Sequence, residues 1–254
     1  MRYEDFKAAD VDDATRRKIL RQLRDTQVEA FDPAFPQSVN IPAATYAPWL
    51  ADAEFQRVYD AVRRNTLVDV YRCHELWVLA TRLARTSGDV LEVGTWRGGT
   101  GCLMAAACAL TAPEKRVFLC DTFAGVVKAG EKDTLYKGGE HSDASSDHVV
   151  ALTDQLNLTN VEILRGIFPD DTAGEVADRR FALCHIDVDV YASARAVFEW
   201  VSPRLSRHGV VVFDDYGFRG CEGVTRLVNE LAVTSDWFTS FNLNGHAVML
   251  KLAT

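Results

Sequence analysis

The chain has 254 residues, of which 48% are hydrophobic and 25% charged, which is enough to bury one full-sized core. Its formal net charge of −8 disfavours a surface that follows nucleic acid phosphates, so we expect no nucleic acid partner. No run of about 18 apolar residues could span a membrane, and the N-terminus "MRYEDFKAAD" lacks the apolar core of a signal peptide, which predicts a cytosolic protein with no membrane partner.

The first 85 residues are predicted to form a helical extension that packs on the main domain. Residues 11–30 carry apolar positions at roughly helical spacing among charges, and Asp12 or Asp13 can cap the start of this helix. Residues 52–85 return to helical periodicity just before Gly88.

Between these helical stretches, residues 31–50 contain four of the seven prolines, which disfavours a helix and favours an ordered loop. This loop could be a linker, a lid or a contact between subunits. Its aromatic side chains would be costly to leave in water, so we expect a homo-oligomer. They are Phe31, Phe35, Tyr46 and Trp49.

From Gly88 onward, short apolar runs alternate with helical segments, a pattern typical of βαβ units and a mostly parallel sheet. We therefore expect residues 86–254 to form one α/β domain with a Rossmann-like fold. Strands are expected at residues 89–93, 116–120, 161–164, 181–187 and 209–214. Helices are expected at residues 99–111, 145–156, 191–205 and 221–232.

The end of the chain breaks this alternation, because "WFTSFNL" and "HAVMLKL" flank Asn244 and Gly245. The Asn-Gly dipeptide suits the positive φ angles of a two-residue type I′ turn. The sheet is therefore predicted to contain seven strands and to end in an antiparallel hairpin.

The six cysteines indicate core packing rather than chemistry. They form no C-x-x-C pair, and most of them lie inside apolar runs. We expect reduced, buried side chains at Cys73, Cys102, Cys108, Cys120, Cys184 and Cys221.

The segment "LEVGTWRGGTG", residues 91–101, joins a predicted strand to a predicted helix through a glycine-containing turn. Glycines let a ligand approach the backbone closely, and a helix N-terminus offers free N–H groups to an anion. The spacing is G-x-x-x-G-G rather than the G-x-G-x-x-G of dinucleotide sites. The segment resembles the first motif of class I S-adenosylmethionine (SAM) methyltransferases, whose loop holds the methionine part of the cofactor.

Two further strand ends could complete a nucleotide site. Asp121 ends the strand in "VFLCDTFAG", just before Thr122, and an acid there can accept hydrogen bonds from both ribose hydroxyls. The same acid could instead cap a helix. Gly166 follows the next strand, and Ile167 or Phe168 could flank an adenine ring, although an apolar pair beside a strand is usually core.

Acidic residues end the last two predicted parallel strands. "HIDVDVY" contains Asp187 and Asp189, and "VFDDYG" contains Asp214 and Asp215. The carboxyl edge of such a sheet is where open α/β proteins bind ligands, so these acids should gather there. Ligands that are all oxygen suit Mg²⁺. For Asp189 we favour a structural role, as the cap of the helix that follows it; the other acids could also be solvated loop residues.

A polar stretch of about 25 residues, 123–147, has no clear helix or strand and is long enough to suggest a lid over an active site. It contains His141, which could lie near an acceptor or could simply be a surface residue.

Together, these segments resemble the macrocin O-methyltransferase family over roughly residues 60–235. That family uses SAM and Mg²⁺ to methylate sugar hydroxyls of macrolide and related antibiotics, so the resemblance implies a sugar-containing small molecule as substrate. It implies Asp187 or His141 as the catalytic base. The implied metal ligands are Asp187, Asp214 and Asp215, and the implied SAM contacts are Glu92, Gly94, Thr95, Gly98, Asp121, Thr122, Gly166 and Ile167.

Three other functions stay open at this point. A catechol-type O-methyltransferase would also use Mg²⁺ to hold two adjacent oxygens, but on an aromatic ring. An NAD-dependent oxidoreductase is disfavoured by the missing G-x-G-x-x-G and by the terminal hairpin. A non-catalytic nucleotide-binding module would have no need for concentrated acids, and fold alone would not decide between these functions.

Overall fold

The computed structural model describes residues 12–25, 44 and 46–252. The chain forms two compact units, Met1–Tyr46 and Ala47–Thr254. Each unit is described by itself below.

The first unit contains helix α1 (Asp13–Asp25), which agrees with the helical spacing of this segment. Asp12 caps the helix, because its carboxylate accepts a hydrogen bond from the backbone N–H of Thr15 over 2.9 Å. Phe31 and Phe35, expected in an aromatic loop, lie outside the described residues.

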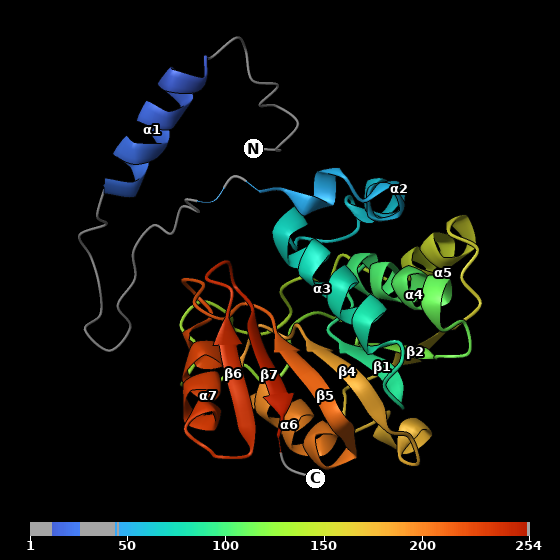
Figure 1. Cartoon of the computed structure of the whole chain (residues 1–254). Coiled ribbons are helices and arrows are strands. Elements are labelled where there is room, and N and C mark those ends of the chain that lie inside the picture. Colours follow the sequence, from blue (N-terminus) through green and yellow to red (C-terminus); the bar gives the residue numbers. More distant parts are fainter. Residues whose placement is uncertain (1–11, 26–43, 45, 253–254) are drawn as a thin grey trace. The chain divides into compact units, whose positions relative to one another are not determined.

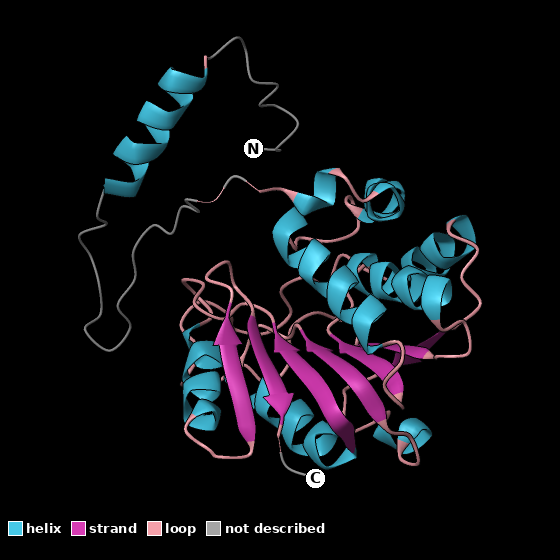
Figure 2. Ribbon diagram, in the orientation of Figure 1, coloured by secondary structure: helices cyan, strands magenta, loops and turns pink. Residues whose placement is uncertain are grey.

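The second unit is built on a seven-stranded sheet with the order β3-β2-β1-β4-β5-β7-β6 (Figure 2). Strands β1 to β5 pair in parallel, and β7 is antiparallel to both β5 and β6. The expected Rossmann-like α/β fold is confirmed. The strands are β1 (Asp89–Val93), β2 (Val117–Asp121), β3 (Val161–Arg165), β4 (Phe181–Ile186), β5 (Leu205–Phe213), β6 (Trp237–Phe241) and β7 (Ala247–Lys251).

Helices cover both faces of this sheet, so each face has its own apolar core (Figure 1). The central strands are apolar along nearly their whole length because both of their faces are buried. One face packs against α2 (Ala53–Val62), α3 (Val70–Leu83), α4 (Gly99–Thr111) and α5 (Ser146–Gln155). The other face packs against α6 (Tyr191–Val201), α7 (Glu222–Ala232) and the 3₁₀ helix Ala173–Val176.

Local chemistry explains where the expected helices differ from the observed ones. The helical stretch 52–85 is two helices, because Asp69 starts α3 by accepting hydrogen bonds from the backbone N–H groups of Tyr71 and Arg72. Helix α6 ends at Val201 rather than at residue 205, because Pro203 lacks an N–H group and lies in a short 3₁₀ turn.

The turn between β6 and β7 is not the expected two-residue type I′ turn. Leu243 and Gly245 have positive φ angles of 59° and 103°, whereas Asn244 does not. The backbone N–H of Asn242 donates to the carbonyl of His246 over 3.1 Å, which leaves a three-residue connection. The side chain of Asn242 stabilises this wider turn by accepting hydrogen bonds from the backbone N–H groups of Asn244 and His246.

Two further expectations concern composition. All six cysteines are buried and unpaired, as predicted for reduced core residues. Across residues 12–25, 44 and 46–252, no helix combines the length and the apolar character needed to cross a membrane.

Trp49, one of the aromatic residues expected at a contact, packs edge-on against Tyr71 with ring centroids 5.0 Å apart.

Gly94, just after β1, offers a test of how closely the ends of β1 and β4 approach each other. Its φ is +92°, and a Cβ would lie 1.6 Å from the backbone oxygen of Asp187. Gly217 has a similar φ of +87° with nothing within 4 Å. We expect Gly217→Ala to lower the free energy of unfolding by about 1–2 kcal/mol, the cost of the left-handed conformation alone. Gly94→Ala should cost at least about 3 kcal/mol because the clash adds to it.

Urea denaturation of the two variants and the parent protein would measure this difference. Equal losses for the two substitutions would contradict the close approach of Gly94 to Asp187.

Candidate active site

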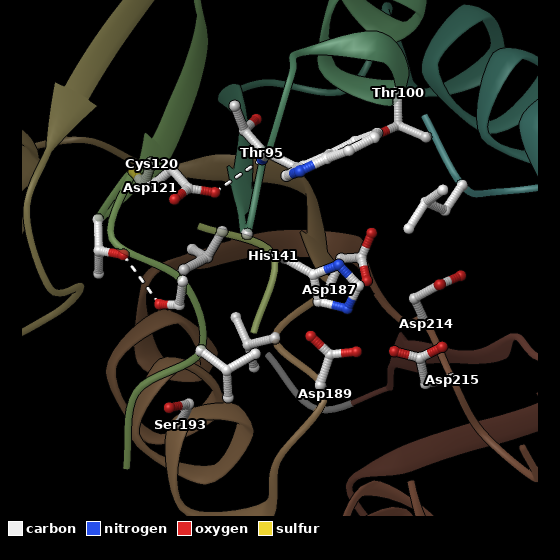
Figure 3. Close-up of a pocket in the computed structure, with 18 of the residues that line it drawn as sticks. Thr95, Thr100, Cys120, Asp121, His141, Asp187, Asp189, Ser193, Asp214 and Asp215 are labelled. Atoms are coloured by element: carbon white, nitrogen blue, oxygen red, sulfur yellow. Dashed lines mark hydrogen bonds between the residues drawn. The ribbon is translucent and has the colours of Figure 1, made fainter. Parts of the chain in front are cut away.

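A cavity of about 290 Å³ opens at the carboxyl ends of the five parallel strands (Figure 3). Every one of these strands delivers a lining residue directly at or after its last position: Gly94 after β1, Asp121 in β2, Gly166 after β3, Asp187 after β4 and Asp214 after β5. Chain segments far apart in sequence therefore meet in one hollow, as expected of an open α/β sheet.

Most of the site residues predicted from sequence line this cavity, and three do not. The lining residues among them are Gly94, Thr95, Asp121, Thr122, His141, Gly166, Asp187, Asp214 and Asp215. Those placed elsewhere are Glu92, Gly98 and Ile167.

Glu92 lies underneath the cavity rather than in it. Its carboxylate is fully buried and accepts a hydrogen bond from the hydroxyl of Thr95, and one oxygen lies 2.9 Å from Nδ1 of His185. Gly98 is the N-cap residue of α4 and has a left-handed φ of 86°, and a Cβ there would lie 3.0 Å from Val149. Both residues therefore shape the turn that carries Thr95 into the cavity wall.

Asp121 is held rigidly at the tip of β2. Its two carboxylate oxygens accept hydrogen bonds from the backbone N–H groups of Trp96 and Phe123, each over 2.7 Å. Burial raises the pKa of Asp121, although these two hydrogen bonds act in the opposite direction. The remaining lone pairs of a fixed, partly desolvated carboxylate are available to a ligand in the cavity.

The segment after β3 settles which apolar residue faces the cavity. Phe168 lines it, whereas Ile167 does not and donates its backbone N–H to Asp171 over 2.8 Å. Thr122 lines the cavity and also ties the next turn, because its hydroxyl donates to the carbonyl of Gly125 over 3.0 Å.

Acidic side chains gather at the other end of the cavity. One carboxylate oxygen from each of Asp187, Asp214 and Asp215 lies within 4.8 Å of the others, and Asp189 lies beside them (Figure 3). The expectation that Asp189 caps α6 is wrong. Val190, the residue before this helix, makes no side-chain cap. Instead the carboxylate of Asp133, 58 residues earlier in the sequence, accepts a hydrogen bond from the backbone N–H of Tyr191 over 2.9 Å.

The electrostatics of these acids are asymmetric. Burial, together with the charge of Asp214, raises the pKa values of Asp187 and Asp215 well above the usual range. Burial alone would also raise the pKa of Asp214, but its contacts with His185, His246 and Arg72 lower it. The cavity therefore has one firmly ionised carboxylate next to two whose ionisation is disfavoured by burial and by neighbouring acids, and this oxygen-only donor set fits a hard divalent cation.

Arg72 is an important residue that the sequence analysis did not identify. It is only 5% exposed, and its Nη1 lies 2.6 Å from Oδ2 of Asp214 while its Nε donates to Asp69 over 2.8 Å. The sequence does contain a pattern that could have identified Arg72, because helical spacing puts it on the apolar face of α3 beside Cys73 and Leu76. An arginine on a buried face requires an acid partner. Other lining residues not predicted are Asn65, Thr66, Leu67, Val68, Trp96, Thr100, Tyr136, Ser193 and Phe218.

The loop after β2 lines one side of the cavity, and residues 122–145 form no helix or strand. His141 is exposed on this loop yet also lines the cavity, with its Nε2 3.4 Å from the hydroxyl of Tyr136. Asp133 anchors the loop from within, because its second oxygen accepts the backbone N–H of Gly130 over 2.9 Å. Ser193 adds a hydrogen bond from its hydroxyl to the carbonyl of Val127 over 2.7 Å.

Comparison with known proteins identifies related sequences and folds. A family model described as Macrocin-O-methyltransferase (TylF) matches residues 63–239. The chain is 31% identical over 169 residues to the 8-demethyl-8-(2,3-dimethoxy-alpha-L-rhamnosyl)-tetracenomycin-C 4'-O-methyltransferase of Streptomyces olivaceus, covering 62% of this chain and 64% of that protein. It is 31% identical over 150 residues to the mycinamicin III 3''-O-methyltransferase of Micromonospora griseorubida, covering 53% and 57%.

These alignments span less than two thirds of the curated relatives' length. Among solved structures, the calicheamicin methyltransferase CalS11 superposes with a TM-score of 0.63 at 16% identity, covering 91% of this chain and all of that one. At this level of identity the likeness concerns the fold.

Asp133 provides a test of how the loop is held against α6. We expect Asp133→Ala to lower the free energy of unfolding by about 1–2 kcal/mol, because it removes a helix cap and a loop hydrogen bond together. Asp143→Ala is the matched control, since Asp143 is on the same loop but pairs with Arg97 at the surface. Its loss should be at most about 1 kcal/mol.

Hydrogen exchange measured by mass spectrometry should show faster exchange across residues 126–141 for Asp133→Ala only. Faster exchange of similar size in both variants would rule out Asp133 as the anchor.

Proposed function

Because this chain belongs to the macrocin O-methyltransferase family, we propose that it transfers a methyl group from SAM to a hydroxyl of a sugar-containing small molecule with the help of Mg²⁺. The observation that carries the proposal is the cavity itself. A nucleotide-type cradle around Thr95 and Asp121 opens into the same hollow as the acids Asp187, Asp214 and Asp215. A methyl donor and a metal-held hydroxyl would therefore meet without further rearrangement.

The cofactor end of the cavity would hold SAM by shape and hydrogen bonding. The Asp121 carboxylate would accept hydrogen bonds from the ribose hydroxyls, and Gly94 and Thr95 would contact the methionine part. Gly166 and Phe168 would flank the adenine ring, replacing the role expected for Ile167. When bound, SAM supplies an electrophilic methyl group on a sulfonium.

The acid end would hold the metal and the acceptor. Asp187, Asp214 and Asp215 would bind Mg²⁺ through carboxylate oxygens, with Arg72 keeping Asp214 ionised. When bound, Mg²⁺ lowers the pKa of a hydroxyl on it and fixes its position. Burial, followed by the charge of Asp214, raises the pKa values of Asp187 and Asp215, and a bound cation would oppose both effects.

The proton of the acceptor hydroxyl needs a base within reach. Asp187 is our first choice because it lines the cavity between the cradle and the other acids. Its backbone N–H donates to the carbonyl of Val93, at the end of β1, over 2.9 Å. His141 is the second choice, since its ring lines the same cavity from the opposite loop (Figure 3). The related tetracenomycin enzyme is named for a rhamnosyl-bearing compound and its 4'-O-position, which supports a sugar acceptor, and the mycinamicin III enzyme is named for a 3''-O-position.

Isothermal titration with SAM and with NAD⁺, each with and without Mg²⁺, tests the cofactor. We expect SAM to bind at micromolar affinity and NAD⁺ to give no heat, because the glycine spacing does not match a dinucleotide site. Absence of SAM binding would reopen the interpretation of the cradle as a cofactor site. Turnover would then be measured with deoxysugar glycosides against a catechol, and methylation of the catechol alone would favour the aromatic-diol alternative.

Substitutions at the two ends of the cavity should separate cofactor binding from metal-dependent turnover. Asp187→Asn or Asp214→Asn should abolish Mg²⁺-dependent turnover while leaving SAM affinity nearly unchanged, because the cradle is intact. Asp121→Asn is the complementary control and should weaken SAM binding by about 10-fold or more, the loss expected for hydrogen bonds to a charged group. Unchanged turnover of Asp187→Asn and Asp214→Asn in chelated buffer would contradict the metal assignment.

A further inference from the structure

A second polar network contacts Asp214, and most of its residues do not line the cavity. It joins α3 to the loop between β6 and β7, and it includes two histidines, His185 and His246, that are both fully buried. Charged and polar groups at this depth are costly unless each one is paired. The methyl-transfer chemistry proposed above uses none of the residues in this loop.

Both oxygens of Asp214 are contacted from this network. Oδ2 lies 2.6 Å from Nη1 of Arg72, and Oδ1 lies 2.7 Å from Nε2 of His246. His185 is farther away, with its Nε2 4.0 Å from Oδ1. The helix therefore holds one oxygen of the carboxylate and the hairpin holds the other, which limits rotation about its side chain.

The hairpin residue is itself held in place by α3. Nδ1 of His246 lies 2.7 Å from Oε2 of Glu75, and the same oxygen accepts a hydrogen bond from the side chain of Asn242 over 2.8 Å. Asn244 reaches back to the start of α3, donating to Asp69 over 2.8 Å.

These contacts form a closed ring that includes Asp214. Asp69 binds Arg72, Arg72 binds Asp214, Asp214 contacts His246, and His246 contacts Glu75. The hairpin loop completes the ring through Asn242 and Asn244. This accounts for the wide turn between β6 and β7, because both asparagine side chains are used in contacts to α3.

We propose that His246 is a positioning residue that orients the carboxylate of Asp214, and that it thereby sets the affinity of the acid cluster for a divalent cation. The inference rests on the proposed function, in which Asp214 is a metal ligand. Outer partners of metal ligands commonly change metal affinity by about 10- to 100-fold when removed. The terminal hairpin is then a working part of the metal site rather than only an edge of the sheet.

The alternative for the same residues is a transition-metal site. One ligand atom from each of His185, His246 and Asp214 lies within 4.8 Å of the others, which could suit a transition metal. Nε2 of His246 and Oδ1 of Asp214 lie 2.7 Å apart as an ion-pair contact, although neither atom makes a hydrogen bond of ordinary geometry, and the same is true of Nε2 of His185. We favour direct pairing because a metal between the two atoms would need a bond of about 2.0–2.2 Å to each of them at a narrow angle. Arg72 also already holds the other oxygen of Asp214.

Two substitutions at position 246 separate the contact of Nε2 with Asp214 from the contact of Nδ1 with Glu75. His246→Gln keeps an amide N–H near the position of Nε2, toward Asp214, whereas His246→Asn keeps one near Nδ1, toward Glu75. Mn²⁺ binding to the full chain, followed by the electron paramagnetic resonance signal of free Mn²⁺, reports metal affinity without turnover. We expect His246→Asn to weaken Mn²⁺ binding about 10-fold or more, and His246→Gln to stay within about threefold of the parent protein.

SAM titration and thermal unfolding of the same variants distinguish positioning from general damage. SAM affinity should change less than about twofold in both variants, since the cradle is at the other end of the cavity. Glu75→Ala, at a side chain that is 30% exposed, gives a second variant in case position 246 does not tolerate change. It should weaken Mn²⁺ binding at least about threefold because His246 loses its outer partner.

Four results would overturn the inference. Parent-like Mn²⁺ affinity in His246→Asn and Glu75→Ala would show that the ring does not act on the metal site. Parallel losses of SAM and Mn²⁺ affinity would indicate a structural role only, and stoichiometric zinc in the parent protein that His246→Asn loses would indicate a metal site instead. Absence of Mn²⁺ binding by the parent protein would overturn the metal assignment itself, and the positioning role with it.

Discussion

The structure depends on the way several carboxylates are brought together at one edge of a buried sheet. Parallel strands β4 and β5 end side by side, so Asp187, Asp214 and Asp215 must share a small, partly desolvated volume. Like charges this close are destabilising without positive partners. Arg72 and His246 contact Asp214 directly, whereas burial and neighbouring acids raise the pKa values of the other two carboxylates. A site with this imbalance is arranged to receive a cation.

Helix α3 and the loop after β2 bury apolar surface and also place polar side chains near the acids. Helix α3 packs its apolar face on the sheet, yet it also sends Asp69, Arg72 and Glu75 toward Asp214 and the terminal hairpin. The loop after β2 plays a comparable role on the other side, where Asp133 caps α6. Because Asp133 caps α6, Asp189 is not needed as the helix cap, and its side chain lines the cavity instead.

Stability and the proposed activity are therefore coupled through the same side chains. The close approach of Gly94 to the backbone of Asp187 brings the cradle and the acids within one cavity. Such proximity is what an in-line transfer between a bound cofactor and a held hydroxyl requires. The family match over residues 63–239 covers every parallel strand end that contributes to this cavity.

The sequence by itself determined the alternation of strands and helices, the Rossmann-like class and the positions of the acids at strand ends, because hydrophobic periodicity is local and parallel strand ends must share one edge. Only the tertiary structure decided which groups face those acids. Arg72 meets Asp214 across 142 residues and Asp133 caps α6 across 58, and no local pattern encodes such pairings. For the same reason local rules failed at Asp189 and at the hairpin turn. At the start of α6 a side chain 58 residues away satisfied the backbone group that Asp189 was expected to satisfy. At the hairpin the side chains of Asn242 and Asn244 bond to Glu75 and Asp69, contacts that the turn sequence does not predict.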